Sequence, residues 1–197
     1  DPKNIQALRP TRALDIFDGG TENFHEDGLF SVSTFGRVGS EDRDQRFSYI
    51  NTNVDLFHPF IYRTICRLKD LYRGILEGKS YARWDDKEKD FVASDVIEGE
   101  TGFHFFASKW KEIKFKETGS NERSMRIRLV NKFRDTCMYN KVLVIPAGYR
   151  DVQIDETGRP KQDEINDFYR TLISISNTIS VSGNKNSSVL DMSRMSM

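Results

Sequence analysis

Five basic side chains lie close together in a segment whose spacing predicts a helix. Arginine and lysine in such a cluster can neutralise nucleic-acid phosphates, and removing any one of these cations would then lower the salt dependence of binding by about one unit. The alternative is an ordinary solvated helical surface, and the sequence leaves both interpretations open. The five residues are Arg123, Arg126, Arg128, Lys132 and Arg134.

Carboxylates arranged for metal catalysis are not evident in the sequence. Two-metal catalysis needs acidic ligands for two metal ions that hold the attacking and leaving oxygens. The nearest candidates are Asp42 with Asp44 and Asp85 with Asp86. They have no apolar residues around them to frame a site, which favours solvated surface. The three histidines are too scattered to predict a metal site. We therefore expect no catalytic residue, cofactor or metal on this chain.

A strand, a short loop and a helix are predicted in the last third of the chain. The β-branched and apolar segment 141–145 (KVLVI) indicates a buried strand, which Pro146 ends. Asp155 to Gly158 (DETG) is typical of a turn whose glycine takes a positive φ. Apolar residues then recur at spacings of three and four, which predicts an amphipathic helix. They are Ile165, Phe168, Tyr169, Leu172, Ile173 and Ile175.

The rest of the chain predicts an α+β protein in four segments. Residues 1–56 contain short apolar groups broken by glycines, which indicates irregular structure with short strands. Residues 57–140 predict one long helix over 57–76, a charged inserted subdomain that includes the cluster 103–106 (FHFF), and a second helix. The second helix follows a cap at 119–121 (GSN) and has Met125, Leu129, Val130 and Phe133 on its apolar face. Residues 141–178 hold the strand, loop and helix described above. Residues 179–197 predict a flexible tail or the start of a further helix, within a polar stretch that begins at Ser176.

Charge and composition narrow the classes of protein. The 197 residues include 30 basic and 30 acidic side chains, so the chain is not a polycation that coats nucleic acid. Residues 85–100 carry seven acids and two lysines, whereas 109–134 carry nine bases and three acids. No run approaches the roughly 18 apolar residues that cross a bilayer, so no membrane contact is expected. Cys66 and Cys137 are predicted to be buried thiols.

Three segments, in one order, resemble the amino-terminal region of the largest (β′) subunit of multisubunit DNA-dependent RNA polymerases. The segment 25–36 (HEDGLFSVSTFG) is similar to the family's Asp-Gly-Leu-Phe followed by Ile-Phe-Gly. The segment 46–59 (RFSYINTNVDLFHP) is similar to its Arg-Phe-Gly-His-Ile element with an apolar run and a histidine. The segment 163–170 (DEINDFYR) is similar to Asp-Leu-Asn-Asp-Leu-Tyr-Arg-Arg at the start of the clamp helices. With the residues around these segments, the resemblance covers about residues 20–60 and 130–178, roughly half of the chain.

The resemblance implies long helices of a polymerase clamp, a lid-like hairpin and the start of the clamp helices. The loop 147–159 would be the lid, at the upstream end of the RNA–DNA hybrid. Tyr149 would stack on nucleic acid, Arg150 would contact a phosphate, and Arg159 would lie with them. Without the resemblance, an ordinary hairpin tip is the simpler interpretation. The face that would bind a promoter-specificity (initiation) factor comprises Asp163, Glu164, Asp167 and Arg170.

Two family features are missing from this sequence. The zinc ribbon would follow the Phe-Gly element, yet residues 37–45 contain no cysteine, so zinc is not expected. The magnesium-binding Asn-Ala-Asp-Phe-Asp-Gly-Asp motif does not occur, so magnesium is expected on a partner subunit. The short chain resembles the divergent split polymerases of large bacteriophages.

The resemblance therefore predicts a non-catalytic clamp subunit of a DNA-directed RNA polymerase. Its partners would be other β- and β′-like subunits, the DNA template, the RNA transcript and a promoter-specificity factor. It would act in the host-cell cytoplasm during infection or be packaged inside the virion. One alternative is a virion structural or accessory protein that uses a β′-like fold only for protein contacts. Another is a regulator that mimics the clamp and binds the host enzyme.

Overall fold

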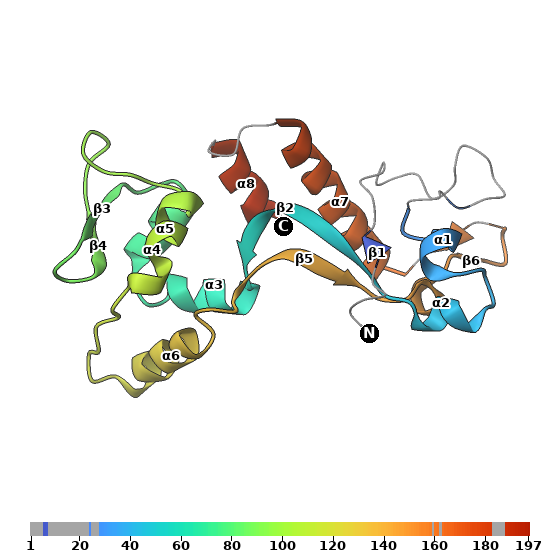
Figure 1. Cartoon of the computed structure of the whole chain (residues 1–197), viewed down its shortest axis with the longest axis horizontal. Coiled ribbons are helices and arrows are strands. Elements are labelled where there is room, and N and C mark those ends of the chain that lie inside the picture. The colour runs from blue at the N-terminus through green and yellow to red at the C-terminus, as the bar shows by residue number, and fades with distance from the viewer. Residues whose placement is uncertain (1–5, 8–23, 25–27, 159, 162, 183–187) are drawn as a thin grey trace. The chain divides into compact units, whose positions relative to one another are not determined.

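The chain has a mixed α+β fold, which confirms the predicted class. The computed structural model describes residues 6–7, 24, 28–158, 160–161, 163–182 and 188–197. They form two compact units (Figure 1). Unit 1 draws on residues 1–54 and 140–183 together with Met197, and unit 2 draws on residues 55–139 and 184–196.

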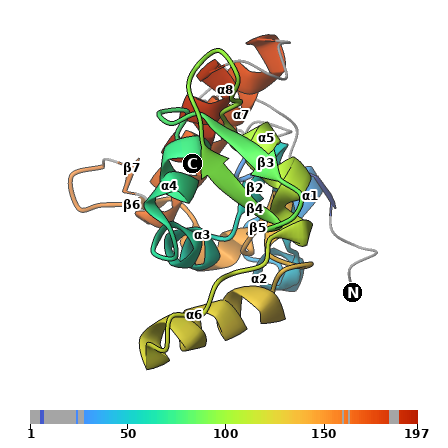
Figure 2. The same cartoon turned by 90° about the vertical axis from the view of Figure 1, so that its left-hand side faces the viewer.

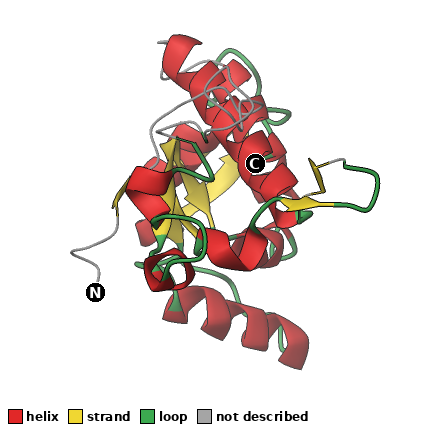
Figure 3. Cartoon of the chain, turned by 90° about the vertical axis from the view of Figure 1, so that its right-hand side faces the viewer, coloured by secondary structure: helices red, strands yellow, loops and turns green. Residues whose placement is uncertain are grey.

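Unit 1 brings together strands and helices from both ends of the sequence. Its sheet has the strand order β1-β2-β5, with β1 parallel to β2. Helix α7 lies alongside β2, where the Ser176 hydroxyl donates to the Asn51 carbonyl at 2.6 Å (Figure 1). A small antiparallel hairpin, β6 with β7, stands out from the rest of the unit (Figure 3). The elements are β1 (Gln6–Ala7), α1 (Val32–Phe35), α2 (Glu41–Gln45), β2 (Ser48–Phe57), β5 (Met138–Val144), the 3-10 helix η3 (Ala147–Arg150), β6 (Gln153–Ile154), β7 (Pro160–Lys161) and α7 (Ile165–Ser182).

Alternating burial along β2 shows how its sequence selects a strand. Every second residue from Ser48 to Leu56 is buried, as expected for side chains that point to opposite faces of a sheet. Ile50 from this strand enters a core that also receives side chains from before and far after it in the sequence. The buried members of this core are Leu29, Phe30, Phe35, Ile50, Val144, Ala147, Tyr169 and Ile173.

Gly36 has a backbone conformation that only glycine adopts easily. It ends α1 with φ 92° and ψ 170°, and its carbonyl accepts a hydrogen bond from the buried Arg43 at 2.8 Å. A Cβ at this position would lie 2.8 Å from the Cβ of Asp42.

We expect Gly36→Ala to lower the free energy of unfolding of unit 1 by about 2 kcal/mol, because it combines backbone strain with this close approach. Urea unfolding would measure the loss. Gly39→Ala is the matched control, since Gly39 also has a positive φ but no neighbour within 4 Å of an added Cβ. Equal losses for the two variants would contradict the role given to the close approach.

Unit 2 consists of short helices and one two-stranded antiparallel sheet (Figure 2). His58 caps the first helix by accepting a hydrogen bond from the Phe60 backbone N–H, and Pro59 occupies the first turn. Ser120 caps a later helix in the same way, as the sequence predicts. The elements are α3 (Pro59–Cys66), α4 (Asp70–Leu76), β3 (Ala82–Asp85), β4 (Asp90–Ala93), α5 (Phe103–Lys109), the 3-10 helix η2 (Trp110–Glu112), α6 (Asn121–Lys132) and α8 (Ser188–Ser196).

Aromatic side chains dominate the core of unit 2. Phe91 and Phe106 stack with ring centroids 5.2 Å apart, and Phe57 meets Trp110 edge-on at 5.1 Å. Offset and edge-on pairs of this kind stabilise beyond their buried area. The cluster Phe103–Phe106, which the sequence placed only in an inserted subdomain, therefore supplies part of the central core.

The prediction of long clamp helices is wrong for the described residues. The longest described helix, α7, has 18 residues. The single helix expected over 57–76 is instead two helices, α3 and α4. Helix α3 ends at Cys66, the backbone of Lys69 before α4 is extended, and the Leu68 carbonyl accepts a hydrogen bond from Arg123 at 2.6 Å. Leu68, in the connection between the two helices, is also buried, so the apolar spacing continues across the break. Periodicity alone therefore could not reveal that the segment is two helices.

Three further expectations need correction. Strand β5 exists, but it lies at the edge of its sheet and buries only Val144, so it is not the buried strand predicted. Helix α6 exists, but it buries Ile127 and Val130 and exposes Met125. Helix α7 continues past Ser176, which is buried and bonded to β2, instead of giving way to a flexible tail. The further helix proposed near the end of the chain is present as α8.

Candidate functional site

Arg150 is the centre of the predicted loop, and the structure encloses it. Its side chain is 1% exposed. Its Nε–H donates to the Ile145 carbonyl at 3.0 Å, and its Nη1–H donates to Oδ1 of Asn166, also at 3.0 Å. The Asn166 amide returns a hydrogen bond to the Arg150 carbonyl at 2.9 Å. Arg150 therefore joins the loop to the first turn of α7.

Three aromatic rings surround the Arg150 guanidinium. Its Cζ lies 4.9 Å from the ring centroid of Phe35, 5.5 Å from that of Phe30 and 5.6 Å from that of Tyr169. Such contacts stabilise a cation that has lost its water. Burial still lowers the pKa of Arg150 to about 10, because desolvation disfavours the charged form. The group nevertheless remains a cation at neutral pH.

Arg43 is a second enclosed guanidinium in the same unit, also 1% exposed. It forms two parallel hydrogen bonds to the carboxylate of Asp151, at 2.6 Å from Nε and 2.5 Å from Nη2. Its Nη1 also donates to the carbonyls of Gly36 and Phe30. Bidentate pairing of this kind fixes geometry as well as charge. Arg43 thus ties helix α2 to the loop that follows η3.

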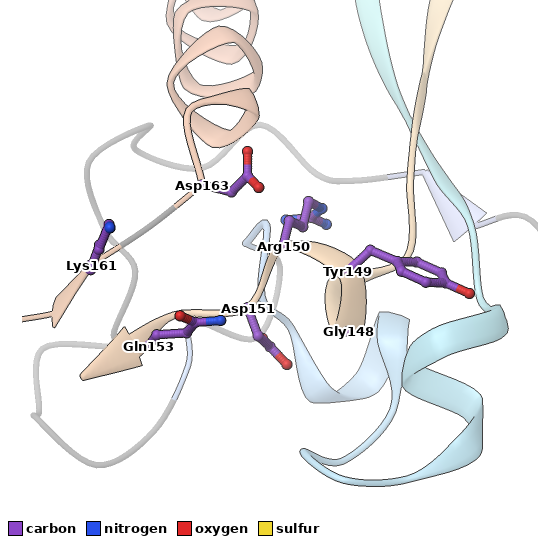
Figure 4. Close-up of a pocket in the computed structure, with 7 residues that line it drawn as sticks. All are labelled: Gly148, Tyr149, Arg150, Asp151, Gln153, Lys161 and Asp163. Atoms are coloured by element: carbon purple, nitrogen blue, oxygen red, sulfur yellow. The ribbon is translucent and has the colours of Figure 1, made fainter. Parts of the chain in front are cut away.

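A small pocket opens beside these arginines. Its volume is about 180 Å³. Figure 4 shows Arg150 lying centrally among the lining residues, with Asp163 from the start of α7 on one side and Tyr149 on the other. The lining residues all belong to unit 1 and are Gly148, Tyr149, Arg150, Asp151, Gln153, Lys161 and Asp163.

The predicted lid residues have different environments. Tyr149 is 69% exposed and free to stack on a ligand. Arg150 is buried, so the expectation that it reaches a phosphate at the loop surface is not supported by its position. Arg159 lies outside the described residues. The turn Asp155–Gly158 forms as predicted, with Gly158 at φ 78° and its N–H bonded to the Asp155 carbonyl.

Of the five basic residues expected to share a phosphate-binding face, two are committed to the fold of unit 2. Arg123 donates to the carbonyls of Lys116 and Leu68. Arg134 donates to the carbonyls of Trp110, Lys111 and Ile113 and lies over the Trp110 ring. They satisfy backbone acceptors and are not displayed for ligands. The remaining three are Arg126, which pairs with Glu122, and the exposed Arg128 and Lys132.

The four residues of the predicted partner face lie at the start of α7. Asp163 accepts a hydrogen bond from the Ile165 backbone N–H and so caps the helix. Glu164 and Asp167 are exposed, and Asp167 lies 3.3 Å from the partly buried Arg170. Three carboxylates are therefore displayed together on the first turn.

The other expectations concern metals, thiols and membranes. Within the described part of the chain, no three His, Cys, Asp or Glu side chains gather as a metal site would require. Cys66 and Cys137 are both buried, as predicted, and burial raises the pKa of each thiol. Of the helices that the structure describes, none has the length and apolar character needed to cross a bilayer.

The sequence interpretation missed the partners of Arg150. Asn166 is fully buried on the same face of α7 as Tyr169 and Ile173, and a polar residue within an apolar stripe was a readable signal. Arg43 gave no such signal, because it lies in the charged run Glu41–Arg46 and looks like surface. The sequence matches no model of a known protein family, and it matches none of the curated proteins.

Proposed function

We propose that the chain is the amino-terminal, clamp-forming part of a β′-like subunit of a DNA-directed RNA polymerase. One observation carries the proposal: the three segments that resemble this family share a single core. Leu29, Phe30 and Phe35 come from the first, Ile50 from the second, and Tyr169 from the third. Motifs that mark one fold should cohere in space, whereas chance matches have no reason to meet.

Strand β5, the loop after it and helix α7, which contains most of the third segment, are held together by the contacts of Arg150 with Ile145 and Asn166. These contacts support a lid role for the loop, but they change the roles that we propose for Tyr149 and Arg150. Tyr149 is the residue that would touch the transcript or the template. Arg150 would position the loop by its hydrogen bonds to Ile145 and Asn166.

The assembled enzyme would divide its work between chains. A partner subunit would bind magnesium and catalyse nucleotide addition. The exposed Arg128 and Lys132 of α6 remain candidates for DNA phosphates, and Asp163, Glu164 and Asp167 for a promoter-specificity factor. The start of the clamp helices would be α7, of which the structure describes 18 residues.

A photoreactive amino acid at position 149 tests the proposal. In a stalled complex assembled from co-expressed subunits, we expect it to crosslink to the RNA–DNA hybrid, because Tyr149 is exposed on the loop. The same amino acid at the exposed Ile97 of unit 2 is the control and should give a weaker hybrid crosslink or none. An assembled complex with no crosslink from position 149 would remove the lid assignment.

A second candidate function is a virion structural or accessory protein with a β′-like fold. The enclosure of Arg150 and the use of Arg123 and Arg134 for backbone carbonyls favour it, because they reduce the cations available to nucleic acid. Binding to β- or β′-like polypeptides in a pull-down supports the first proposal. A monodisperse monomer that binds neither supports the second.

A further inference from the structure

Within its described residues, unit 1 encloses two arginines, and only one of them is paired with a carboxylate. Arg43 and Arg150 are each 1% exposed. Asp151 pairs with Arg43 at 2.5 Å, and no ion pair of Arg150 is found among the described residues. A buried charge without a counter-ion costs free energy. Among the described residues, the Arg150 guanidinium therefore has no carboxylate paired with it.

One nitrogen of Arg150 also lacks a hydrogen-bond acceptor. Nε and Nη1 are satisfied, but the buried Nη2 has no partner within the described structure. The aromatic rings stabilise the cation but are weak acceptors. A buried polar group left unpaired costs roughly 1–3 kcal/mol and calls for an explanation such as a bound ion or water.

The pocket that Arg150 lines has the size and donors for a small anion. Its volume of about 180 Å³ is below the roughly 300 Å³ at which sites for drug-sized ligands begin. Lys161 and Gln153 are exposed at its edge and provide an ammonium and an amide. Of the two carboxylates in its lining, Asp151 is held by Arg43 and Asp163 caps α7.

We propose that this pocket binds a phosphate-type oxyanion, with Arg150 as its principal partner and Lys161 as a second cation. The anion supplies the missing counter-charge and an acceptor for Nη2. It also bridges the loop, the β6–β7 hairpin and the start of α7, which all contribute to the lining. This inference does not depend on the polymerase proposal, since it rests on the charge and hydrogen bonds of unit 1 alone.

Inorganic phosphate, exchanged for chloride at constant ionic strength, is the first probe. We expect saturable changes in the amide NMR signals of residues 148–151 and a higher thermal midpoint. Lys161→Gln should weaken binding about 3- to 10-fold, the effect of one partly screened charge. Asp163→Asn should strengthen binding by a similar factor, because asparagine also caps a helix but does not repel an anion.

A lysine in unit 2 provides the matched control. Lys111 is an exposed lysine paired with Asp135, and Lys111→Gln should leave phosphate binding unchanged. Loss of affinity that is equal for Lys111→Gln and Lys161→Gln would show nonspecific screening and overturn the proposal. So would the absence of a saturable response in the unsubstituted protein.

A second arm identifies the source of the anion. A short RNA with a 5′-phosphate is compared with the same RNA carrying a 5′-hydroxyl. Tighter binding of the phosphorylated RNA, by a margin that shrinks in Lys161→Gln, assigns the pocket to a nucleic-acid end. Equal binding of the two RNAs, with inorganic phosphate still bound, assigns it to a free anion. Both outcomes support an oxyanion site, and neither requires an active polymerase.

Discussion

An Arg150→Met variant should lose about 3 kcal/mol of the free energy of unfolding of unit 1. Methionine keeps much of the packing against Phe35 and Tyr169 but provides no donors. The Ile145 carbonyl and Oδ1 of the fully buried Asn166 would then lose their hydrogen bonds. Amide hydrogen exchange within unit 1, followed by mass spectrometry, would measure the loss separately from unit 2.

Two companion variants show which property of Arg150 matters. Arg150→Lys keeps the charge but not the planar fork, so we expect a loss as large as that of Arg150→Met. Tyr149→Ala removes the exposed neighbour and should leave exchange in unit 1 nearly unchanged. A methionine variant as stable as the unsubstituted protein would mean that relief of the buried charge outweighs the missing hydrogen bonds.

In unit 2, Asp90→Ala should lower the free energy of unfolding by about 3 kcal/mol. The buried Asp90 carboxylate accepts hydrogen bonds from the Tyr72 hydroxyl at 2.6 Å, the Lys69 ammonium at 2.7 Å and the Phe91 backbone N–H at 2.7 Å. Alanine would leave the Tyr72 hydroxyl and the Phe91 N–H without this acceptor next to the aromatic core, and Lys69 would keep only its hydrogen bond to the Phe91 carbonyl. Urea unfolding followed by tryptophan fluorescence would report the change, since Trp110 lies in that core.

Milder variants calibrate the effect of Asp90. Tyr72→Phe removes one donor and keeps the ring against Phe91 and Phe106, so a loss of about 1 kcal/mol is expected. Asp86→Ala breaks the exposed contact with Lys89 and should leave the urea midpoint where it is. If Asp86→Ala and Asp90→Ala shifted the midpoint equally, the burial of the Asp90 network would not be the source of its stability.

The sequence predicted those elements whose signals are local. The turn at Asp155–Gly158, the Ser120 cap of α6 and the apolar stripe of α7 each depend on residues a few positions apart. The split of the 57–76 segment escaped prediction, because the buried Leu68 keeps the apolar spacing across it, and the Arg123 that bonds the Leu68 carbonyl lies far along the chain. Local periodicity carries no information about such a partner.

The sequence places the candidate site on the loop 147–159 and assigns roles to its side chains by residue type. An arginine on a loop suggests a phosphate contact, and a tyrosine suggests stacking on a base. Tyr149 has the exposure that stacking needs. Arg150 is instead buried, because its guanidinium donates to Asn166 and packs against three aromatic rings. Whether an arginine is structural or displayed depends on tertiary partners, which only the folded chain reveals.

Unit 1 is assembled from two stretches of sequence with residues 55–139 between them. The hydrogen bonds of Arg43 to Asp151 span 108 positions, and the core joins Phe30 to Tyr169. During synthesis, the first stretch must therefore wait on the ribosome until the second has emerged, while most of unit 2 is already available to fold. A chain terminated before residue 140 would leave Leu29, Phe30 and Phe35 without their partners, exposed to aggregation or to a chaperone.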